Sequence, residues 1–307
     1  MNGLLPGREV RVEVVAVTDP GQRRSENQDQ FLVADLSHRD PNGPLLHGGD
    51  DRPGVHGPEA FPVGELGGLL LVCDGMGGAA GGATASGMAI RVIHGMMSTQ
   101  WATERRRIPV HFARHMAAAL EQANTLIYDR SRRETDLGGM GTTATAVGVL
   151  DTHLLLGQVG DSRAYLFRQG VLTQLTRDQS VVQMLRESGA LAADEVRTDR
   201  RSNLILQALG STPKVTVDLT HQSLREGDVA LLCSDGLSGE VDDVEIGRIL
   251  SRPLPLESIG QELVDLANAR GGPDNITVIL ARFEGDALSP PVDGELVRRN
   301  PMALEGG

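Results

Sequence analysis

The chain has 307 residues, enough for one large domain or two small ones, and carries a formal net charge of −12 at pH 7. This acidic balance argues against a nucleic-acid-binding protein, because the phosphates of DNA or RNA would be repelled. Lys214 is the single lysine in the sequence, which argues against a P-loop or a Schiff-base site.

The two cysteines and the hydropathy of the chain indicate a cellular compartment. Cys73 and Cys233 lie within apolar runs and are typical of small buried side chains, so a reducing cytoplasm fits better than a disulfide framework. Residues 1–17 lack the apolar segment of a signal peptide, and no stretch approaches the roughly 20 apolar residues of a membrane span. We expect a soluble cytoplasmic protein without membrane association.

The N-terminal segment predicts two strands followed by a loop. Residues 10–17 alternate polar and apolar, which predicts an entering strand, and residues 30–34 predict its neighbour across a turn at residues 18–21. Residues 36–67 are rich in Gly, Pro, Asp and His and lack periodicity. We expect them to form a long surface insertion loop.

Two helices are predicted next. One covers residues 83–97, after a glycine-rich segment, and the other begins near Pro109, because proline is favoured at the first position of a helix. Apolar residues recur at helical spacing in the second helix and indicate a buried face. They are Phe112, Met116, Leu120 and Ile127.

The middle of the chain predicts a run of strands and then an interruption. Residues 142–150, 154–159 and 164–167 predict an antiparallel meander, and residues 171–175 predict a strand that returns beside it. Residues 177–210 mix short helical patterns with polar loop. We expect this segment to be an inserted flap.

The C-terminal part predicts a buried strand at residues 229–233, helices at residues 242–250 and 256–269, and a last strand at residues 276–282. The remaining residues 284–307 are rich in Pro, Gly and charge, which predicts a disordered tail. Strands dominate both halves with helices in pairs between them. This pattern favours a single α+β domain over residues 10–283, with packed antiparallel sheets flanked by helices, over a doubly wound parallel sheet.

Four aspartates lie at the ends of predicted buried strands. Asp74, Asp161 and Asp235 each follow a short apolar run, and Asp274 precedes one. Carboxylates that converge at strand ends would repel one another unless a hard, oxygen-binding cation neutralised them. The sequence therefore predicts a site for a divalent cation, Mg²⁺ or Mn²⁺.

The glycines after Asp74 allow a competing interpretation. Gly75, Gly77 and Ala80 match the spacing of a dinucleotide-binding fingerprint between a strand and a helix. However, the carboxylate of Asp74 would lie close to the pyrophosphate, and the expected second strand with an acidic residue is missing. Repetition of the Asp-Gly pair at Asp235 favours the cation site.

Six short segments stand in a fixed order along the chain: residues 24–29 (RSENQD), 72–78 (VCDGMGG), 141–144 (GTTA), 160–163 (GDSR), 234–237 (SDGL) and 272–278 (GPDNITV). In this order they resemble the metal-dependent protein phosphatases of the PPM group, the type 2C serine/threonine phosphatases, in their bacterial form. The resemblance covers nearly the whole chain and implies a four-layer αββα sandwich, in which helix pairs flank two central antiparallel sheets.

The resemblance also implies roles for individual residues. Two Mn²⁺ or Mg²⁺ ions would be held by Asp74, the carbonyl of Gly75, Asp235 and Asp274. Asp29 would bind directly or through water, Asp161 with Asp235 would hold a third and weaker ion, and Arg24 would grip the substrate phosphate with its planar fork. The catalytic residues expected from the resemblance are Arg24, Asp29 and Asp74.

The function that the resemblance implies is hydrolysis of phosphoserine and phosphothreonine in proteins by a water activated between two metal ions. Its substrates would be the products of a serine/threonine kinase, and we expect a monomer. Met76 stands where many eukaryotic members carry a histidine proposed as general acid, and Gly239 replaces a further aspartate of those relatives, which bears on the third ion. The alternative is a phosphatase-fold regulatory module that binds phosphoprotein without turnover.

Overall fold

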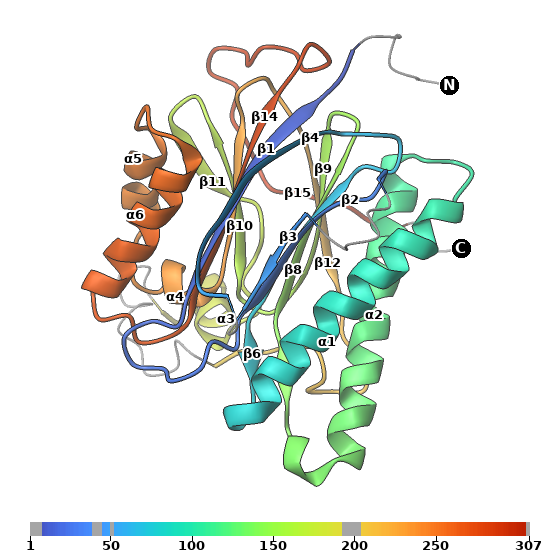
Figure 1. The fold of residues 1–307 in the computed structure, drawn as a ribbon, viewed down its shortest axis with the longest axis vertical. Helices are drawn as coiled ribbons and strands as arrows, with labels where there is room; N and C mark the ends of the chain where they lie inside the picture. Colours follow the sequence, from blue (N-terminus) through green and yellow to red (C-terminus); the bar gives the residue numbers. More distant parts are fainter. Residues whose placement is uncertain (1–7, 39–44, 50–51, 192–203, 305–307) are drawn as a thin grey trace.

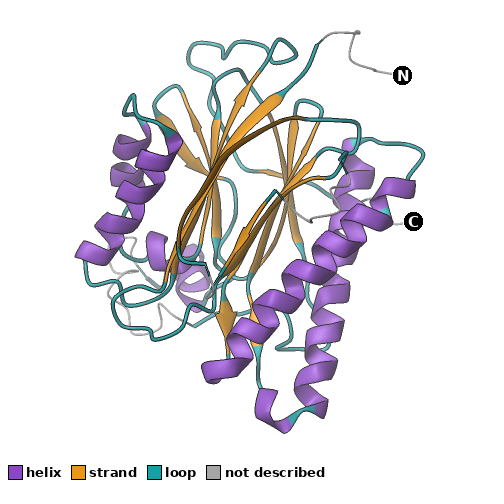
Figure 2. Cartoon of the chain, in the orientation of Figure 1, coloured by secondary structure: helices purple, strands orange, loops and turns teal. Residues whose placement is uncertain are grey.

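A computed structural model describes residues 8–38, 45–49, 52–191 and 204–304 of the chain. In these residues, two antiparallel β-sheets lie face to face between helices α1 and α2 on one side and α5 and α6 on the other (Figures 1 and 2). The expected four-layer αββα sandwich is confirmed.

The first sheet of the described chain has six strands in the order β11-β10-β13-β14-β1-β4. Strands β1 and β14 run antiparallel from Arg11 opposite Glu284 to Asp19 opposite Ile276. The strands are β1 (Arg11–Asp19), β4 (Gly54–Pro62), β10 (Arg163–Arg168), β11 (Val171–Gln174), β13 (Val229–Cys233) and β14 (Ile276–Glu284).

The second sheet has seven strands among the described residues, in the order β15-β12-β9-β8-β5-β2-β3, and a short ladder of β6 and β7 lies beside it. The strands are β2 (Gln30–Asp35), β3 (Leu46–Gly48), β5 (Gly68–Cys73), β6 (Gly75–Met76), β7 (Gly141–Thr142), β8 (Ala144–Leu150), β9 (His153–Val159), β12 (Asp218–Ser223) and β15 (Asn300–Pro301).

The helices cover the outer faces of the sheets. Helices α1 (Gly78–Thr99) and α2 (Pro109–Arg133) contact the second sheet, and α6 (Leu256–Ala269) contacts β1 and β14 of the first. No helix in the described ranges is both long and apolar enough to cross a bilayer. The shorter helices are η1 (Trp101–Thr103), η2 (Thr135–Leu137), α3 (Val181–Glu187), α4 (Asp235–Ser238) and α5 (Asp243–Leu250).

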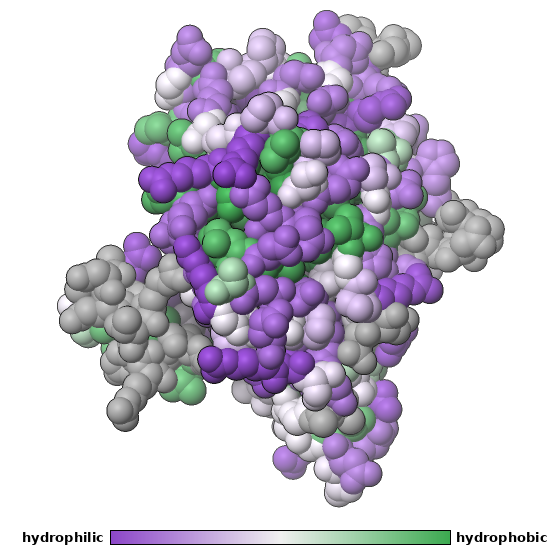
Figure 3. Space-filling view, turned by 60° about the vertical axis from the view of Figure 1, so that its left-hand side comes forward, coloured by the Kyte–Doolittle hydropathy of each residue, from purple (hydrophilic) through white to green (hydrophobic). Residues whose placement is uncertain are grey.

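Apolar side chains fill three layers of core. In β5, Leu69 and Leu71 pack against the helices, while Leu70 and Val72 pack between the sheets. Because both faces of such a strand are buried, its sequence is a continuous apolar run rather than an alternation. The face drawn in Figure 3 is mostly hydrophilic, with smaller hydrophobic areas between the polar residues.

Two predicted strand pairings are wrong. The strand at residues 30–34 is not a neighbour of β1, because β2 pairs with β3 and β5 in the other sheet. The meander also breaks: β8 and β9 pair, but β10 crosses to the first sheet beside β11 and β13. An apolar run that is buried on both faces carries no signal for which sheet it joins.

The segment expected to be a surface loop contains structure. Within residues 36–67, β3 pairs with β2, and β4 forms the edge of the first sheet beside β1. Strand β4 is largely exposed but anchors the buried side chain of Phe61. Its Gly and Pro obscured the strand, because an edge strand tolerates residues that a central strand excludes. Helix α1 likewise begins at Gly78, five residues before the expected start at residue 83.

The expected disordered tail is also different in the structure. Leu288 is buried, Glu295 accepts two 3.0 Å hydrogen bonds from Arg225, and β15 pairs with β12 at the edge of the second sheet. The described part of the tail thus follows the sandwich to Leu304, which packs against the helix-side core. The few apolar residues of the tail are separated from one another in the sequence and are buried individually. The average composition of the tail therefore did not indicate that this segment packs against the domain.

The tail yields a stability prediction. We expect Leu288→Ala to lower the free energy of unfolding by about 2–4 kcal/mol, because it removes a buried leucine from the core between the sheets. Urea denaturation would measure the change. The matched control is Leu296→Ala on the same tail, where the leucine is 69% exposed and little change is expected. Equal, near-zero effects would show that the tail is detached in solution.

Candidate metal centre

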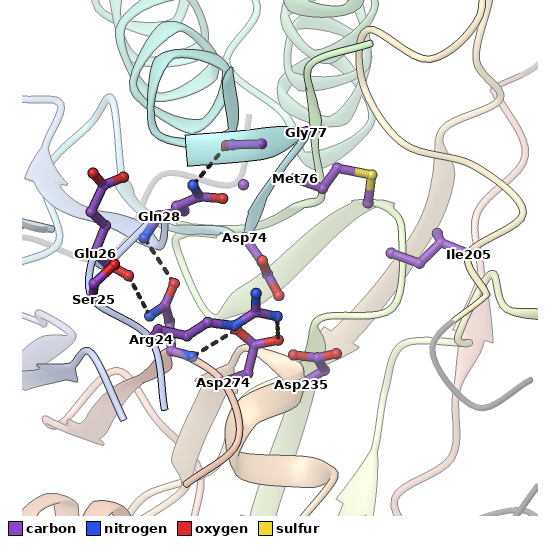
Figure 4. Close-up of a pocket in the computed structure, with 13 residues that line it drawn as sticks. Arg24, Ser25, Glu26, Gln28, Asp74, Met76, Gly77, Ile205, Asp235 and Asp274 are labelled. Carbon is purple, nitrogen blue, oxygen red and sulfur yellow. Dashed lines mark hydrogen bonds and ion pairs between the residues drawn. The ribbon is translucent and has the colours of Figure 1, made fainter. Parts of the chain in front are cut away.

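Three of the predicted aspartates line one cavity of about 410 Å³ (Figure 4). Asp74 follows β5 of the second sheet, Asp235 begins α4 directly after β13, and Asp274 precedes β14 of the first sheet. The cavity therefore opens where strand ends from both sheets meet. Gly75 and Arg24 line the same cavity, so these five expected site residues are brought together.

Asp29 and Asp161 lie behind the cavity wall. Both are buried, Asp29 just before β2 and Asp161 in the loop between β9 and β10. Burial, and then the charges of Asp29, Asp235, Asp161 and Asp274, raise the pKa of Asp74 well above its usual range. Five carboxylates thus lie within electrostatic reach of one another.

Burial and neighbouring charges also change the pKa values of Asp29 and Asp161. Burial raises the pKa of Asp29 to about 7, although hydrogen bonds from Ser234 and Thr277 oppose the change. Burial and the nearby charge of Asp235 raise the pKa of Asp161 to about 8. Without a cation, the folded protein therefore holds protons on this cluster that free aspartates would release.

The donor atoms fit hard divalent cations. Within the described residues, one oxygen of each of Asp29, Asp161 and Asp235 is buried and has no hydrogen-bond partner. Such orphaned carboxylate oxygens are the ligands that Mg²⁺ and Mn²⁺ prefer. Among the described residues, no three carboxylate, imidazole or thiol groups are placed so that together they could hold one metal ion.

Arg24 is the cation that the structure places in the cavity. Its Nη2 lies 2.7 Å from Oδ2 of Asp274, and its side chain is 55% exposed (Figure 4). The ion pair with Asp274, together with the charges of Asp74 and Asp235, raises the pKa of the Arg24 guanidinium. Asp274 therefore takes up one of the guanidinium donors that an anion at the cavity mouth would also use.

Asn275 positions the loop that carries Arg24. Its Nδ2 donates 2.9 Å hydrogen bonds to the carbonyls of Pro20 and Glu26, and its Oδ1 accepts one of 2.8 Å from the backbone of Gln28. In the sequence, Asn275 was recognised only as part of a motif and was given no role. Its position directly after a metal-ligand candidate and before a buried strand was the available signal.

Hydroxyl groups fix two of the aspartates. Ser234 donates a 2.7 Å hydrogen bond to Asp29 and accepts one of 2.9 Å from the backbone of Thr277. Thr143 accepts a 2.9 Å hydrogen bond from the backbone of Asp74 and donates its own N–H to the Asp74 carbonyl. Ser234 and Thr143 are thus structural residues of the site, and neither of them was assigned a role from the sequence alone.

The repeated Asp-Gly pairs have a steric cause. A Cβ atom on Gly75 would lie 2.3 Å from the carbonyl oxygen of Gly82, and one on Gly236 would lie 2.0 Å from that of Asn275. Both contacts are with backbone, which cannot move aside. Glycine is therefore required after each aspartate so that the chain can fold closely around the site.

The flap is attached beside the centre. The backbone of Gln179 donates a hydrogen bond to the carbonyl of Gly160, and its side chain accepts one from the Gly160 N–H. At the other end of the flap, Ile205 lines the cavity (Figure 4). Residues 192–203 of the expected flap lie outside the described residues.

Comparison with known proteins agrees with this architecture. A family model described as "Protein phosphatase 2C" matches residues 60–281. The serine/threonine phosphatase stp of Listeria monocytogenes serotype 4b is 34% identical over 264 residues, which cover 86% of this chain and 92% of that protein.

Solved structures give the same result. The S. agalactiae serine/threonine phosphatase superposes with a TM-score of 0.73 and 32% identity, covering 88% of this chain and 98% of the other. The catalytic domain of the phosphatase PstP, solved in complex with two manganese ions, gives a TM-score of 0.69 and 32% identity over 90% of this chain and 99% of that domain.

The raised pKa values of Asp29 and Asp161 predict how cation binding depends on pH. In the unfolded chain such groups lose their protons near the ordinary aspartate pKa of 3.8, but in the folded ion-free protein they retain them to about 7 and 8. Their contribution to stability is therefore lost as the pH rises from about 4 through these values.

A cation replaces these protons, so we expect Mn²⁺ to raise the melting temperature more at about pH 8 than at about pH 5.5. Thermal unfolding with Mn²⁺ and with EDTA at each pH measures this difference. Asp29→Asn should reduce the pH dependence, because it removes one of the titrating groups. A stabilisation by Mn²⁺ that is greater at the lower pH would contradict the assignment.

Proposed function

We propose roles for individual residues in the reaction of this chain, which belongs to the protein phosphatase 2C family. The chain is a serine/threonine protein phosphatase, which removes phosphate from proteins with the help of divalent cations. The observation that carries the proposal is the convergence of Asp74, Asp235 and Asp274 from two sheets into one cavity that also contains Arg24.

The proposed ligands of two Mn²⁺ or Mg²⁺ ions are Asp74, the carbonyl of Gly75, Asp235 and Asp274, with Asp29 bound directly or through water. The unpartnered carboxylate oxygens support this assignment. Asp161 is proposed to hold a third, weaker ion together with Asp235, whose charge contributes to the raised pKa of Asp161.

When bound, the two cations supply Lewis acidity, which lowers the pKa of a water and neutralises charge on the phosphate oxygens. The chain's own residues set the geometry. Asp74 and Asp235 hold the reacting centre at the junction of the sheets, and the Thr143 and Asn275 hydrogen bonds keep the surrounding backbone in place. The Ser234 hydroxyl is engaged by Asp29 and Thr277, so it is not free to act as a nucleophile.

Arg24 is proposed to bind the phosphate of the substrate. Its guanidinium presents parallel N–H groups that match two phosphate oxygens. One of these groups, at Nη2, donates a hydrogen bond to Asp274. Neutralisation of Asp274 by a cation would release this donor for the phosphate of the substrate.

The wider setting is also part of the proposal. The catalytic domain would span residues 10–283, with the flap at residues 177–210 contributing to substrate choice through Ile205. The buried, unpaired Cys73 and Cys233 suit a reducing cytoplasm. We propose that the protein acts there as a monomer and reverses the action of a serine/threonine kinase.

Removal of the ligands tests the mechanism. We expect Asp74→Asn and Asp235→Asn to lower kcat/KM for a phosphothreonine peptide by at least about a hundredfold, because each change removes a ligand charge at the centre. EDTA should abolish turnover and Mn²⁺ should restore it. Release of phosphate is the measurement.

The surface carboxylate of Asp265, which lies on helix α6 and accepts a hydrogen bond from Gln261, provides the matched control in Asp265→Asn. Full activity in EDTA, or in both ligand variants, would refute the mechanism. Peptide binding without any turnover in Mn²⁺ would instead favour a regulatory module that only binds phosphoprotein.

A separate prediction concerns Arg24. We expect Arg24→Ala to lower kcat/KM for the peptide about 10- to 100-fold, since a hydrogen bond to a charged group contributes about 1.5–3 kcal/mol. The control is Arg23→Ala, because this neighbour is exposed and does not line the cavity. Equal losses in the two variants would indicate a general charge effect rather than phosphate binding.

A further inference from the structure

A second groove lies beside the catalytic cavity, at the end of helix α2. It has a volume of about 470 Å³ and differs from the first cavity in having no acidic residue in its lining. In Figure 1 the end of α2 and the beginning of α1 lie at the same, lower end of the molecule. The groove is lined by Tyr128, Ser131, Arg132, Thr135, Gly138, Gly139, Gly210 and Ser211.

Only one layer of backbone separates the groove from the catalytic cavity. Gly77 lines the cavity and Gly139 lines the groove, and a Cβ on Gly77 would lie 2.8 Å from the carbonyl oxygen of Gly139. Met76, also in the cavity wall, pairs with Gly141 in the β6–β7 ladder. A peptide bound at the catalytic centre could therefore reach the groove within a few extended residues, at about 3.3–3.6 Å per residue.

Arg132 makes the groove cationic. In the last turns of α2, Arg130 is paired with Glu134 and Arg133 with Asp129. Arg132 is exposed and has no ion pair among the described residues. In a protein of net charge −12, an uncompensated guanidinium next to the reaction centre favours an anionic ligand.

The rest of the lining suits a peptide. Ser131, Thr135 and Ser211 contribute hydroxyl groups, and Gly138 and Gly139 leave the backbone uncovered by side chains. Gly139 has a φ of +78°, and a Cβ placed there would meet no atom within 4 Å, so the space over it is open. A main chain can lie close to such a surface and place a side chain beside Arg132.

We propose that this groove is a substrate subsite, in which Arg132 binds an anionic side chain located a few residues from the phosphorylated residue. The proposal rests on the phosphatase function given above and adds a sequence preference to it. The anionic group is the carboxylate of Asp or Glu or a second phosphate, because a guanidinium recognises both.

Phosphothreonine peptides that carry one Glu at successive positions on either side of the phosphothreonine, each compared with its Gln counterpart, test the subsite. For the unchanged enzyme we expect Glu at one position to lower KM about two- to fivefold, the range for an exposed ion pair, with little change in kcat. A second phosphothreonine at that position should have a larger effect if phosphate is the preferred anion.

Arg132→Ala should abolish the preference for Glu, and Arg132→Glu should reverse it in favour of a Lys peptide. Arg133→Ala is the matched control, since it removes the same charge from the same turn of helix but lies outside the groove. Turnover of p-nitrophenyl phosphate, which is too small to reach Arg132, should be the same in all four proteins.

The outcomes separate the two proposals. Normal turnover of both substrates without a Glu preference at any position would overturn the subsite alone. So would an equal loss of the preference in Arg133→Ala, or a parallel fall in p-nitrophenyl phosphate turnover with Arg132→Ala. Absence of turnover of either substrate by the unchanged enzyme in Mn²⁺ would refute the phosphatase and the subsite together.

Discussion

Repulsion among buried carboxylates is the constraint around which this molecule is organised. Asp74 belongs to one sheet of the sandwich, whereas Asp235 and Asp274 belong to the other. Ionised together without a counter-ion, these groups would force apart the ends of the strands that carry them. Protons on the cluster, the guanidinium of Arg24 or divalent cations can each relieve that repulsion, and of these Arg24 is the group that a phosphate would also attract.

Hydrogen bonds hold the charged groups close in spite of this repulsion. Asn275 connects the loop of Arg24 to the start of β14, Ser234 connects Asp29 to Thr277, and Thr143 fixes the backbone of Asp74. The Asn275 and Thr143 bonds join uncharged groups and do not change with pH, whereas the Ser234 bond is made to the titrating carboxyl group of Asp29. The frame of the site therefore exists before the cations arrive, and cation binding changes mainly the charge within it.

Local sequence patterns predicted most of the longer helices and strands and picked out the aspartates that come together in one cavity. The apolar run before Asp74 and the stripe that includes Phe112 have periods or lengths typical of single elements, and both segments form as expected. Strand partners were not predictable in the same way. The side chains of β2 and β10 fit either sheet, and the choice depends on how the whole chain packs.

The remaining errors have a similar origin. Phe61 and Leu288 are single apolar residues within polar, Gly- and Pro-containing segments, and each is buried by a groove that distant parts of the chain create. Asn275 gave no local signal for its three backbone partners, because Pro20, Glu26 and Gln28 are about 250 positions away. Long-range hydrogen bonds of this kind appear only in the folded chain.

The pairing of β15 with β12 has a consequence for folding during synthesis. On the side away from β9, Thr220 and His221 pair with Pro301 and Asn300, roughly eighty residues later in the chain. Until that stretch has been synthesised, this edge of the second sheet exposes unpaired amide and carbonyl groups to other nascent chains. The last strand therefore shields part of an edge that is open to wrong pairing during synthesis.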